Sequence, residues 1–166
     1  MHEKVLEYKL FVHKSHMNTK TSDYYVNFFF NEAIHGKKLS WNWSAFFFCS
    51  LWFFYRKMYF EGLFFLLLES ILEFTFISFS ISKFFAVDNS ILQYYLILVI
   101  LHTISGCYGN YLYFKRFQFI SDRAPIDKNK RTLYFTKKGG FSIFSILLYC
   151  QIKVTIYMFI YTIHPL

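Results

Sequence analysis

The chain has 166 residues, of which 55% are hydrophobic and 25% aromatic, and its formal net charge is +8. A soluble domain carries about a quarter charged residues, whereas only 17% are charged here, so the composition disfavours a soluble fold. The basic residues lie mostly between apolar runs, which favours membrane topology and anionic lipid as their explanation and disfavours nucleic acid as a partner.

Residues 1–40 are mixed and polar and form a predicted cytoplasmic lead. Within this lead, residues 24–34 predict an amphipathic helix that rests on the membrane surface and stops at Gly36. His13 and His16 are the candidate metal ligands of the lead, but their spacing matches none of the zinc patterns. The sequence therefore predicts no metal and no cofactor.

Residues 41–55, WNWSAFFFCSLWFFY, form an apolar run that is dense in aromatic side chains. Fifteen residues of helix measure about 22 Å, which is less than the ~30 Å thickness of a hydrocarbon core. The run is too apolar for water and too short to cross. We expect a re-entrant or interfacial helix that enters one leaflet and returns.

Three longer apolar runs follow, at residues 59–82, 91–114 and 141–163, and each is long enough to span a bilayer. Residues 115–140 between the last two are hydrophilic and basic, and they predict a cytoplasmic loop. The predicted fold class is an all-α integral membrane protein, with a short re-entrant or interfacial helix plus three transmembrane helices in a membrane domain at residues 41–166.

The placement of charge selects the topology. If residues 41–55 crossed fully, the lysine-rich lead and the basic loop would lie on opposite sides of the membrane, against the positive-inside bias. If the run returns, both lie on one side. We therefore expect a cytoplasmic N-terminus and an external C-terminus.

The run at 41–59, with the sequence WNWSAFFFCSLWFFYRKMY, resembles the hallmark of a family of small bacterial membrane proteins classed as a domain of unknown function. The matching positions are Trp41, Asn42, Trp43, Ala45, Phe46, Trp52, Tyr55, Arg56, Lys57, Met58 and Tyr59. Weaker similarity lies around Gly109–Asn110 and Gly139–Gly140, so that the resemblance covers about residues 35–145. This chain departs from the hallmark at Cys49–Ser50, where Gly-Pro is usual. The resemblance implies a bacterial cytoplasmic-membrane location and no activity.

Polar residues inside the predicted spans are the first candidate site. A carboxylate at the bilayer centre costs roughly 2.5–3.5 kcal/mol on insertion scales, so Glu69 and Glu73, four residues apart on one helical face, need a reason to be there. One interpretation is a proton or ion path that includes His102. The other, which we favour, is packing between helices, with the carboxylates paired to Lys153 or other polar groups. The predicted polar residues are Glu69, Glu73, His102, Asn110, Gln151 and Lys153.

Arg56 and Lys57 form the second candidate site, together with Trp41, Trp43 and Trp52. They are candidate contacts to phospholipid headgroups. The alternative, which we favour, is a basic stop signal flanked by an interfacial aromatic belt. For Asn110, with Gly106 and Gly109 close by, we expect a packing role, such as a hydrogen bond to Asn42.

The sequence contains no motif of a known catalytic class, and we predict no enzyme and no catalytic residue. The favoured function is a non-enzymatic accessory subunit or homo-oligomer that packs with other membrane helices. The alternatives are a small ion or proton channel that uses the intramembrane carboxylates and a binder of lipid headgroups. The expected partners are the lipid bilayer, anionic phospholipid and either another membrane protein or further copies of this chain.

Overall fold

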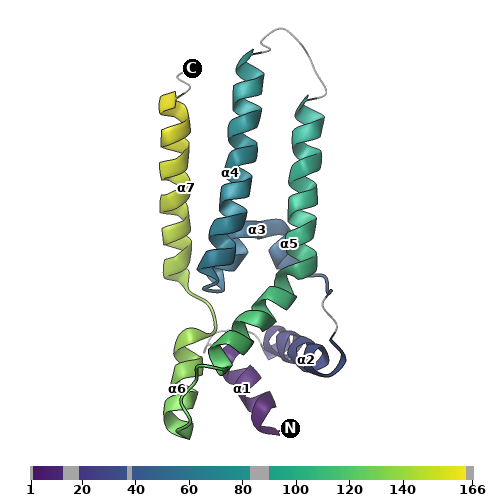
Figure 1. The fold of residues 1–166 in the computed structure, drawn as a ribbon, viewed down its shortest axis with the longest axis vertical. Helices are drawn as coiled ribbons and strands as arrows, with labels where there is room; N and C mark the ends of the chain where they lie inside the picture. Colours follow the sequence, from purple (N-terminus) through teal and green to yellow (C-terminus); the bar gives the residue numbers. More distant parts are fainter. Residues whose placement is uncertain (1, 13–18, 37–38, 83–89, 164–166) are drawn as a thin grey trace.

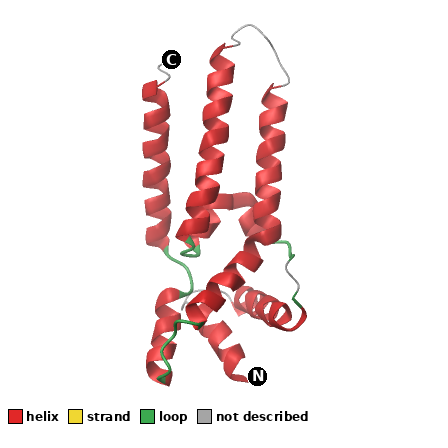
Figure 2. Ribbon diagram, viewed as in Figure 1, coloured by secondary structure: helices red, strands yellow, loops and turns green. Residues whose placement is uncertain are grey.

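The computed structural model describes residues 2–12, 19–36, 39–82 and 90–163, and these form helices joined by short loops (Figure 2). The helices are α1 His2–Val12, α2 Thr19–His35, α3 Trp43–Tyr55, α4 Tyr59–Ser82, α5 Ser90–Ser121, α6 Lys128–Lys138 and α7 Ile143–Ile163. The prediction of an all-α protein is confirmed. His13 and His16 lie outside the described residues.

The helices form two parts along the long axis of the molecule. α4, α5 and α7 run lengthwise, and α3 lies across the lower parts of α4 and α5 (Figure 1). α1, α2 and α6 gather with the last turns of α5 at one end, whereas α7 ends at the other (Figure 1). The polar lead and the basic segment after α5 therefore lie at the same end of the molecule.

Two segments, Leu92–Ser121 and Lys128–Ile160, contain a stretch that is long and apolar enough to cross a membrane. Only 22% and 11% of their apolar stretches are buried, whereas the core helix of a soluble protein would be mostly buried. α4 has 24 residues and is mostly apolar, and its charged residues are three glutamates, Glu61, Glu69 and Glu73. By length and composition, the segments Leu92–Ser121 and Lys128–Ile160 thus each contain a long apolar helix suited to membrane insertion.

α3 is broken near its middle. Cys49 has φ 36° and ψ −113°, which interrupts the helix. Asn42 caps the first half, because its side chain accepts a hydrogen bond from the backbone N–H of Ala45. The backbone N–H of Asn42 itself donates to the carbonyl of Gly106, 2.9 Å away, and so fastens this end of α3 to α5. The break supplies the change of direction that a returning helix needs.

The N-terminal lead folds into two helices instead of one. Phe11 of α1 and Phe29 of α2 are almost fully buried, and both rings contact Tyr113 of α5. The expected surface helix at 24–34 is therefore part of α2, and its apolar face packs against protein. Aromatic side chains of the lead thus pack against the last turns of α5. The prediction had assigned those turns to a membrane span and to the loop after it.

The segment 115–140, which was predicted as a loop between two spans, is mostly helical, and its cytoplasmic placement stays a prediction. α5 continues past Lys115 and Arg116 to Ser121, because Phe117 and Ile120 pack into the core below the apolar stretch. α6 then begins after Asp127, whose side chain accepts a hydrogen bond from the backbone N–H of Lys130. Its one buried side chain, Phe135, joins the same core.

Candidate functional site

Polar side chains from four helices meet beside the break in α3. We call this group the polar cluster, and its members are Cys49, Ser50, Glu69, Glu73, His102 and Lys153. α3 contributes the first two, α4 the two glutamates, α5 the histidine and α7 the lysine. Residues that lie far apart in the sequence are thus brought within reach of one another.

Glu73 and Lys153 form the strongest contact of the polar cluster. Lys153 Nζ lies 2.8 Å from Glu73 Oε1, to which the Tyr157 hydroxyl also donates at 3.2 Å. The same ammonium lies 3.9 Å from Glu69 Oε2. The pairing of Lys153 with the carboxylates of α4, which the sequence predicted, is therefore present between α4 and α7.

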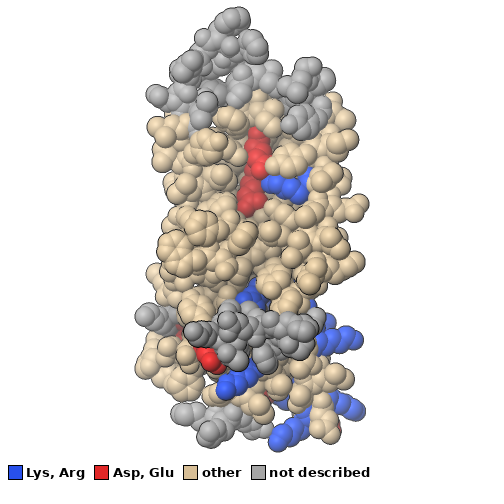
Figure 3. All heavy atoms as spheres, turned by 180° about the vertical axis from the view of Figure 1, so that it is seen from behind, with Lys and Arg blue, Asp and Glu red and all other residues tan. Residues whose placement is uncertain are grey.

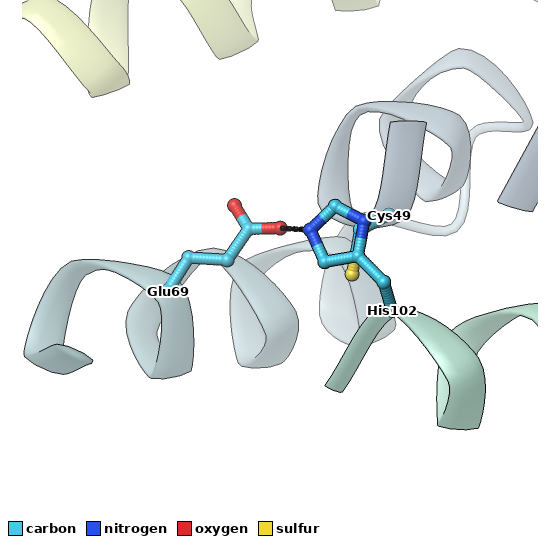
Figure 4. A group of neighbouring side chains, drawn as sticks. All are labelled: Cys49, Glu69 and His102. Atoms are coloured by element: carbon cyan, nitrogen blue, oxygen red, sulfur yellow. Dashed lines mark ion pairs between the residues drawn. The ribbon is translucent and has the colours of Figure 1, made fainter. Parts of the chain in front are cut away.

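Glu69 connects α4 to α3 and α5. The Ser50 hydroxyl donates a 2.6 Å hydrogen bond to Glu69 Oε2, and Oε1 lies 3.9 Å from Nε2 of His102. Nδ1 of His102 is 2.6 Å from the carbonyl oxygen of Phe46. Figure 4 shows the Glu69 carboxylate directed at the His102 ring, with the sulfur of Cys49 close to both.

The polar cluster is not sealed inside the molecule. Glu69 is 9% exposed at its side chain, Lys153 16% and Glu73 19%. In Figure 3, acidic and basic side chains lie next to one another within a band of the surface that is otherwise uncharged, far from the basic end. The charged side chains of the polar cluster are therefore partly exposed on the side of the apolar helices.

Asn110 lies in a second polar network, at the junction of α5 with α2 and α3. Its Oδ1 accepts a 2.7 Å hydrogen bond from Asn42, and its Nδ2 donates to the Tyr24 and Ser40 hydroxyls, each 2.7 Å away. Asn110 is fully buried. The hydrogen bond to Asn42 is confirmed, and it serves the close packing of α3 on α5 rather than the polar cluster.

Gln151 is not part of either network. It is exposed. Since it precedes Lys153 by two positions, it lies about 200° round α7 and faces the opposite way. The expectation that Gln151 belongs with the intramembrane polar residues is wrong for this reason.

Arg56 is enclosed by aromatic rings instead of facing headgroups. It is 3% exposed, and its guanidinium carbon lies 4.5 Å from the ring centre of Tyr25 and 5.1 Å from that of Tyr113. Burial alone would lower the pKa of Arg56, but the hydroxyls of Tyr113, Tyr25 and Tyr55 outweigh it, and the pKa is raised. Arg56 is thus a permanent internal cation.

Lys57 also has a structural role. Its Nζ donates hydrogen bonds to the carbonyl oxygens of Lys137 and Gly139, 3.0 and 2.7 Å away, at the C-terminus of α6. Trp52 is 3% exposed, whereas Trp41 and Trp43 are 38% and 63% exposed. The expectation of a headgroup contact is therefore wrong for Arg56 and Trp52, and Lys57 is directed at protein. Of the five candidate headgroup contacts, Trp41 and Trp43 have exposed side chains.

Sequence reasoning missed Cys49, Ser50 and Tyr157. Cys49 and Ser50 reach Glu69 because α3 breaks at this point, and neither residue type by itself indicates a break, although the hallmark has Gly-Pro at these positions. Tyr157 was within reach of prediction, since it follows Lys153 by one helical turn and so shares its face.

A family model described as "Protein of unknown function (DUF2628)" matches residues 11–119, which is more than half of the chain. The matched range holds Cys49, Ser50, Glu69, Glu73 and His102, and it ends before Lys153. Searches of curated proteins and of solved structures found no match.

Proposed function

We propose that this chain, which belongs to the DUF2628 family of proteins of unknown function, is a non-enzymatic multi-pass membrane protein that packs side by side with other membrane helices. Those helices come from further copies of the chain or from a partner membrane protein. In this proposal α4, α5 and α7 cross the bilayer, and α3 enters from one side and returns.

The surfaces of the long helices support insertion. Large apolar side chains point outward along all three, with examples on α4 at Phe64, Leu67 and Ile71, on α5 at Leu96, Val99 and Ile100, and on α7 at Leu147, Val154 and Met158. Exposed apolar area on this scale is unfavourable in water and neutral in lipid. The buried core, in contrast, lies around α1, α2, α3 and the end of α5.

The observation that carries lateral packing is the partial exposure of the Glu73–Lys153 pair. Both side chains are open at the flank of the apolar band, and α4 and α7 touch at few points. A charged group that faces hydrocarbon costs several kcal/mol unless it is paired and shielded. A further helix packed over the α4–α7 seam would exclude lipid from the pair.

The basic end of the molecule supports the orientation. α6 carries four lysines and Arg131, α1 and α2 carry further lysines, and these helices lie at one end of the molecule (Figures 1 and 3). Under the positive-inside bias this end faces the cytoplasm, next to anionic phospholipid. The location we propose is the bacterial cytoplasmic membrane, which the resemblance of the hallmark implies.

Purification of the tagged chain in mild detergent, with light scattering for its mass and mass spectrometry of co-purifying proteins, tests the proposal. We expect a defined complex, either of several copies or with a stoichiometric membrane protein. Replacement of Leu147, at the exposed flank of α7, by Trp should weaken the complex, whereas Leu133→Trp on α6 should not. A monomer with no stoichiometric companion would overturn lateral packing.

A second candidate function is proton or ion transfer. Titratable groups follow one another from His102 to Glu69 to Lys153 to Glu73, at separations of 3.9, 3.9 and 2.8 Å. Such a series is the arrangement that proton relays use in membranes. Flux into liposomes that is lost in Glu69→Gln/Glu73→Gln would support it, and no flux above that of empty liposomes would exclude it.

A further inference from the structure

Three different donor atoms converge at the break in α3. They are the sulfur of Cys49, a carboxylate oxygen of Glu69 and a ring nitrogen of His102, and all lie within 4.8 Å of one another (Figure 4). Each comes from a different helix, α3, α4 or α5. Cys49 and Glu69 are buried, and His102 is 24% exposed at its side chain.

His102 is held in the tautomer that a metal ligand needs. A carbonyl oxygen only accepts hydrogen bonds, so the 2.6 Å contact with the carbonyl of Phe46 places the proton on Nδ1. In the neutral ring, Nε2 then presents a lone pair toward Glu69. Metal-bound histidines usually donate their other N–H to a carbonyl or carboxylate in this way.

Glu69 is oriented by a similar outer contact. The Ser50 hydroxyl donates to Oε2 at 2.6 Å and the Ser50 backbone N–H donates to Oε1 at 3.5 Å, and Oε1 is the carboxylate oxygen on the side of His102. The separation of 3.9 Å between Oε1 and Nε2 is too long for a hydrogen bond, which would bring them to about 2.7–2.9 Å. The two atoms thus face each other across a gap.

The sulfur of Cys49 completes the group from the side. Cys49 is fully buried, and its position is set by the interrupted backbone of α3 rather than by a regular helix. Zinc lies about 2.3 Å from sulfur and about 2.0–2.2 Å from nitrogen or oxygen. In a tetrahedral arrangement the donors would then be about 3.5 Å apart. The three atoms lie within 4.8 Å of one another, so each pair would have to approach by about 1.3 Å at most, which changes in the side-chain torsions can supply.

The charge of the surroundings favours a cation there. The facing charged groups are Glu69, Glu73 and Lys153, which together carry one net negative charge when His102 is neutral. A divalent ion with the thiolate of Cys49 would bring the total to zero. In a region that is shielded from water, neutrality of the whole group is strongly preferred.

From this geometry we propose that Cys49, Glu69 and His102 bind a divalent transition-metal ion of the zinc type and leave one coordination position open. Sulfur, imidazole and carboxylate together suit Zn²⁺ and disfavour Mg²⁺ and Ca²⁺, which take oxygen ligands. Three protein ligands with an open position differ from the closed four-ligand sites of structural zinc. The proposal does not depend on lateral packing, because all three ligands belong to one chain.

The test uses the full chain, purified in detergent, stripped with a chelator and titrated with Co²⁺ as a spectroscopic probe. We expect one equivalent per chain, with a thiolate-to-cobalt charge-transfer band that Zn²⁺ abolishes and Mg²⁺ does not. Cys107→Ser and Cys150→Ser, at the other two cysteines, are the matched controls and should keep the band.

Variants separate ligands from the residue that orients them. Cys49→Ser should remove the band, and Glu69→Gln or His102→Gln should weaken binding by more than the about 10–100-fold that loss of an outer-shell partner causes. Ser50→Ala should fall within that range. Cys49→Gly removes the sulfur where the backbone already adopts a positive φ, and elution volume and tryptophan fluorescence check that each variant is folded.

Two results would overturn the proposal. One is the absence of a thiolate band in the unmodified protein with Co²⁺ in excess. The other is a band that persists in folded Cys49→Gly. The first measurement uses the unmodified protein. The proposal can therefore be refuted even if every variant fails to fold.

Discussion

Asn42 donates a 2.7 Å hydrogen bond from Nδ2 to Oδ1 of Asn110, which joins the N-cap of α3 to the interior of α5. Both side chains are buried, and the Oδ1 of Asn42 is already used to cap α3. The start of the α3 helix and its attachment to α5 therefore depend on the same pair of amides.

Asn110→Ala should destabilise the fold by about 1–3 kcal/mol, because the buried Asn42 amide loses its acceptor and the hydroxyls of Tyr24 and Ser40 lose a donor. Thermal unfolding in detergent, followed by tryptophan fluorescence, measures the loss. Asn129→Ala, at an exposed position of α6, is the control and should change little. Equal effects of the two changes would contradict a structural role for Asn110.

The Glu73–Lys153 pair predicts non-additive effects. Lys153→Leu leaves Glu69 and Glu73 without their cation in an apolar region. Glu73→Leu leaves Lys153 with only its longer 3.9 Å contact to Glu69, and the double change leaves Glu69 alone. Each single change should reduce stability by less than the about 3–5 kcal/mol of a fully buried pair, since both side chains are partly exposed. The double variant should be more stable than Lys153→Leu in the same unfolding assay, because it holds one carboxylate without a cation instead of two. Losses that simply add would argue against the pair.

Gly109 allows α3 to approach α5, and a larger residue there should force them apart. A Cβ at Gly109 would lie 2.8 Å from the Cβ of Ala45 and 3.5 Å from the Trp52 ring. Gly109→Val should therefore cost about 1–3 kcal/mol through overpacking. Ile97→Val, at an exposed position of the same helix, serves as the control. An unfolding temperature that matches the control would show that the contact is not tight.

Arg56 should be coupled to the ring beneath it. Arg56→Gln removes a desolvated cation–π contact with Tyr25 worth about 2 kcal/mol or more. Once Tyr25 is replaced by Leu, the same change at Arg56 should cost less. A double-mutant cycle measured by chemical unfolding gives the difference, and a coupling energy near zero would refute the contact.

The arrangement of the helix ends predicts which residues share a side of the membrane. Single cysteines at Asn31 on α2 and Asn129 on α6, in a background without Cys49, Cys107 and Cys150, should react with an impermeant maleimide from the same side. A cysteine at Thr162, near the end of α7, should react only from the other side. Labelling of the first two from opposite sides would exclude a returning α3.

Much of the helical layout was accessible from the sequence, because apolar length against bilayer thickness is a strong signal. The run predicted at 59–82 corresponds to α4, and the run at 141–163 begins two residues before α7. The contact of Lys153 with the glutamates of α4 was also predictable. An isolated charge in an apolar helix needs a partner of opposite charge, and the predicted spans contain few such residues.

The predictions that differ from the structure failed for a different physical reason. Lys115 and Arg116 were interpreted as the end of a helix, but charged side chains do not end a helix, and α5 runs on to Ser121. α6 was missed because a hydrophilic sequence resembles a loop, although Asp127 provides an N-cap signal. The position of Cys49 depends on tertiary contacts that hold a strained backbone angle, and no local pattern carries that information.

The two hydrogen bonds from Lys57 to the C-terminus of α6 have a mechanical consequence. Ser142 donates its backbone N–H to the carbonyl of Tyr55 at the same junction, so the bases of α4 and α7 are clamped together. Because Glu73 and Lys153 also join α4 and α7 further along, the two helices can separate most easily beyond that ion pair, at the ends that lie away from α6.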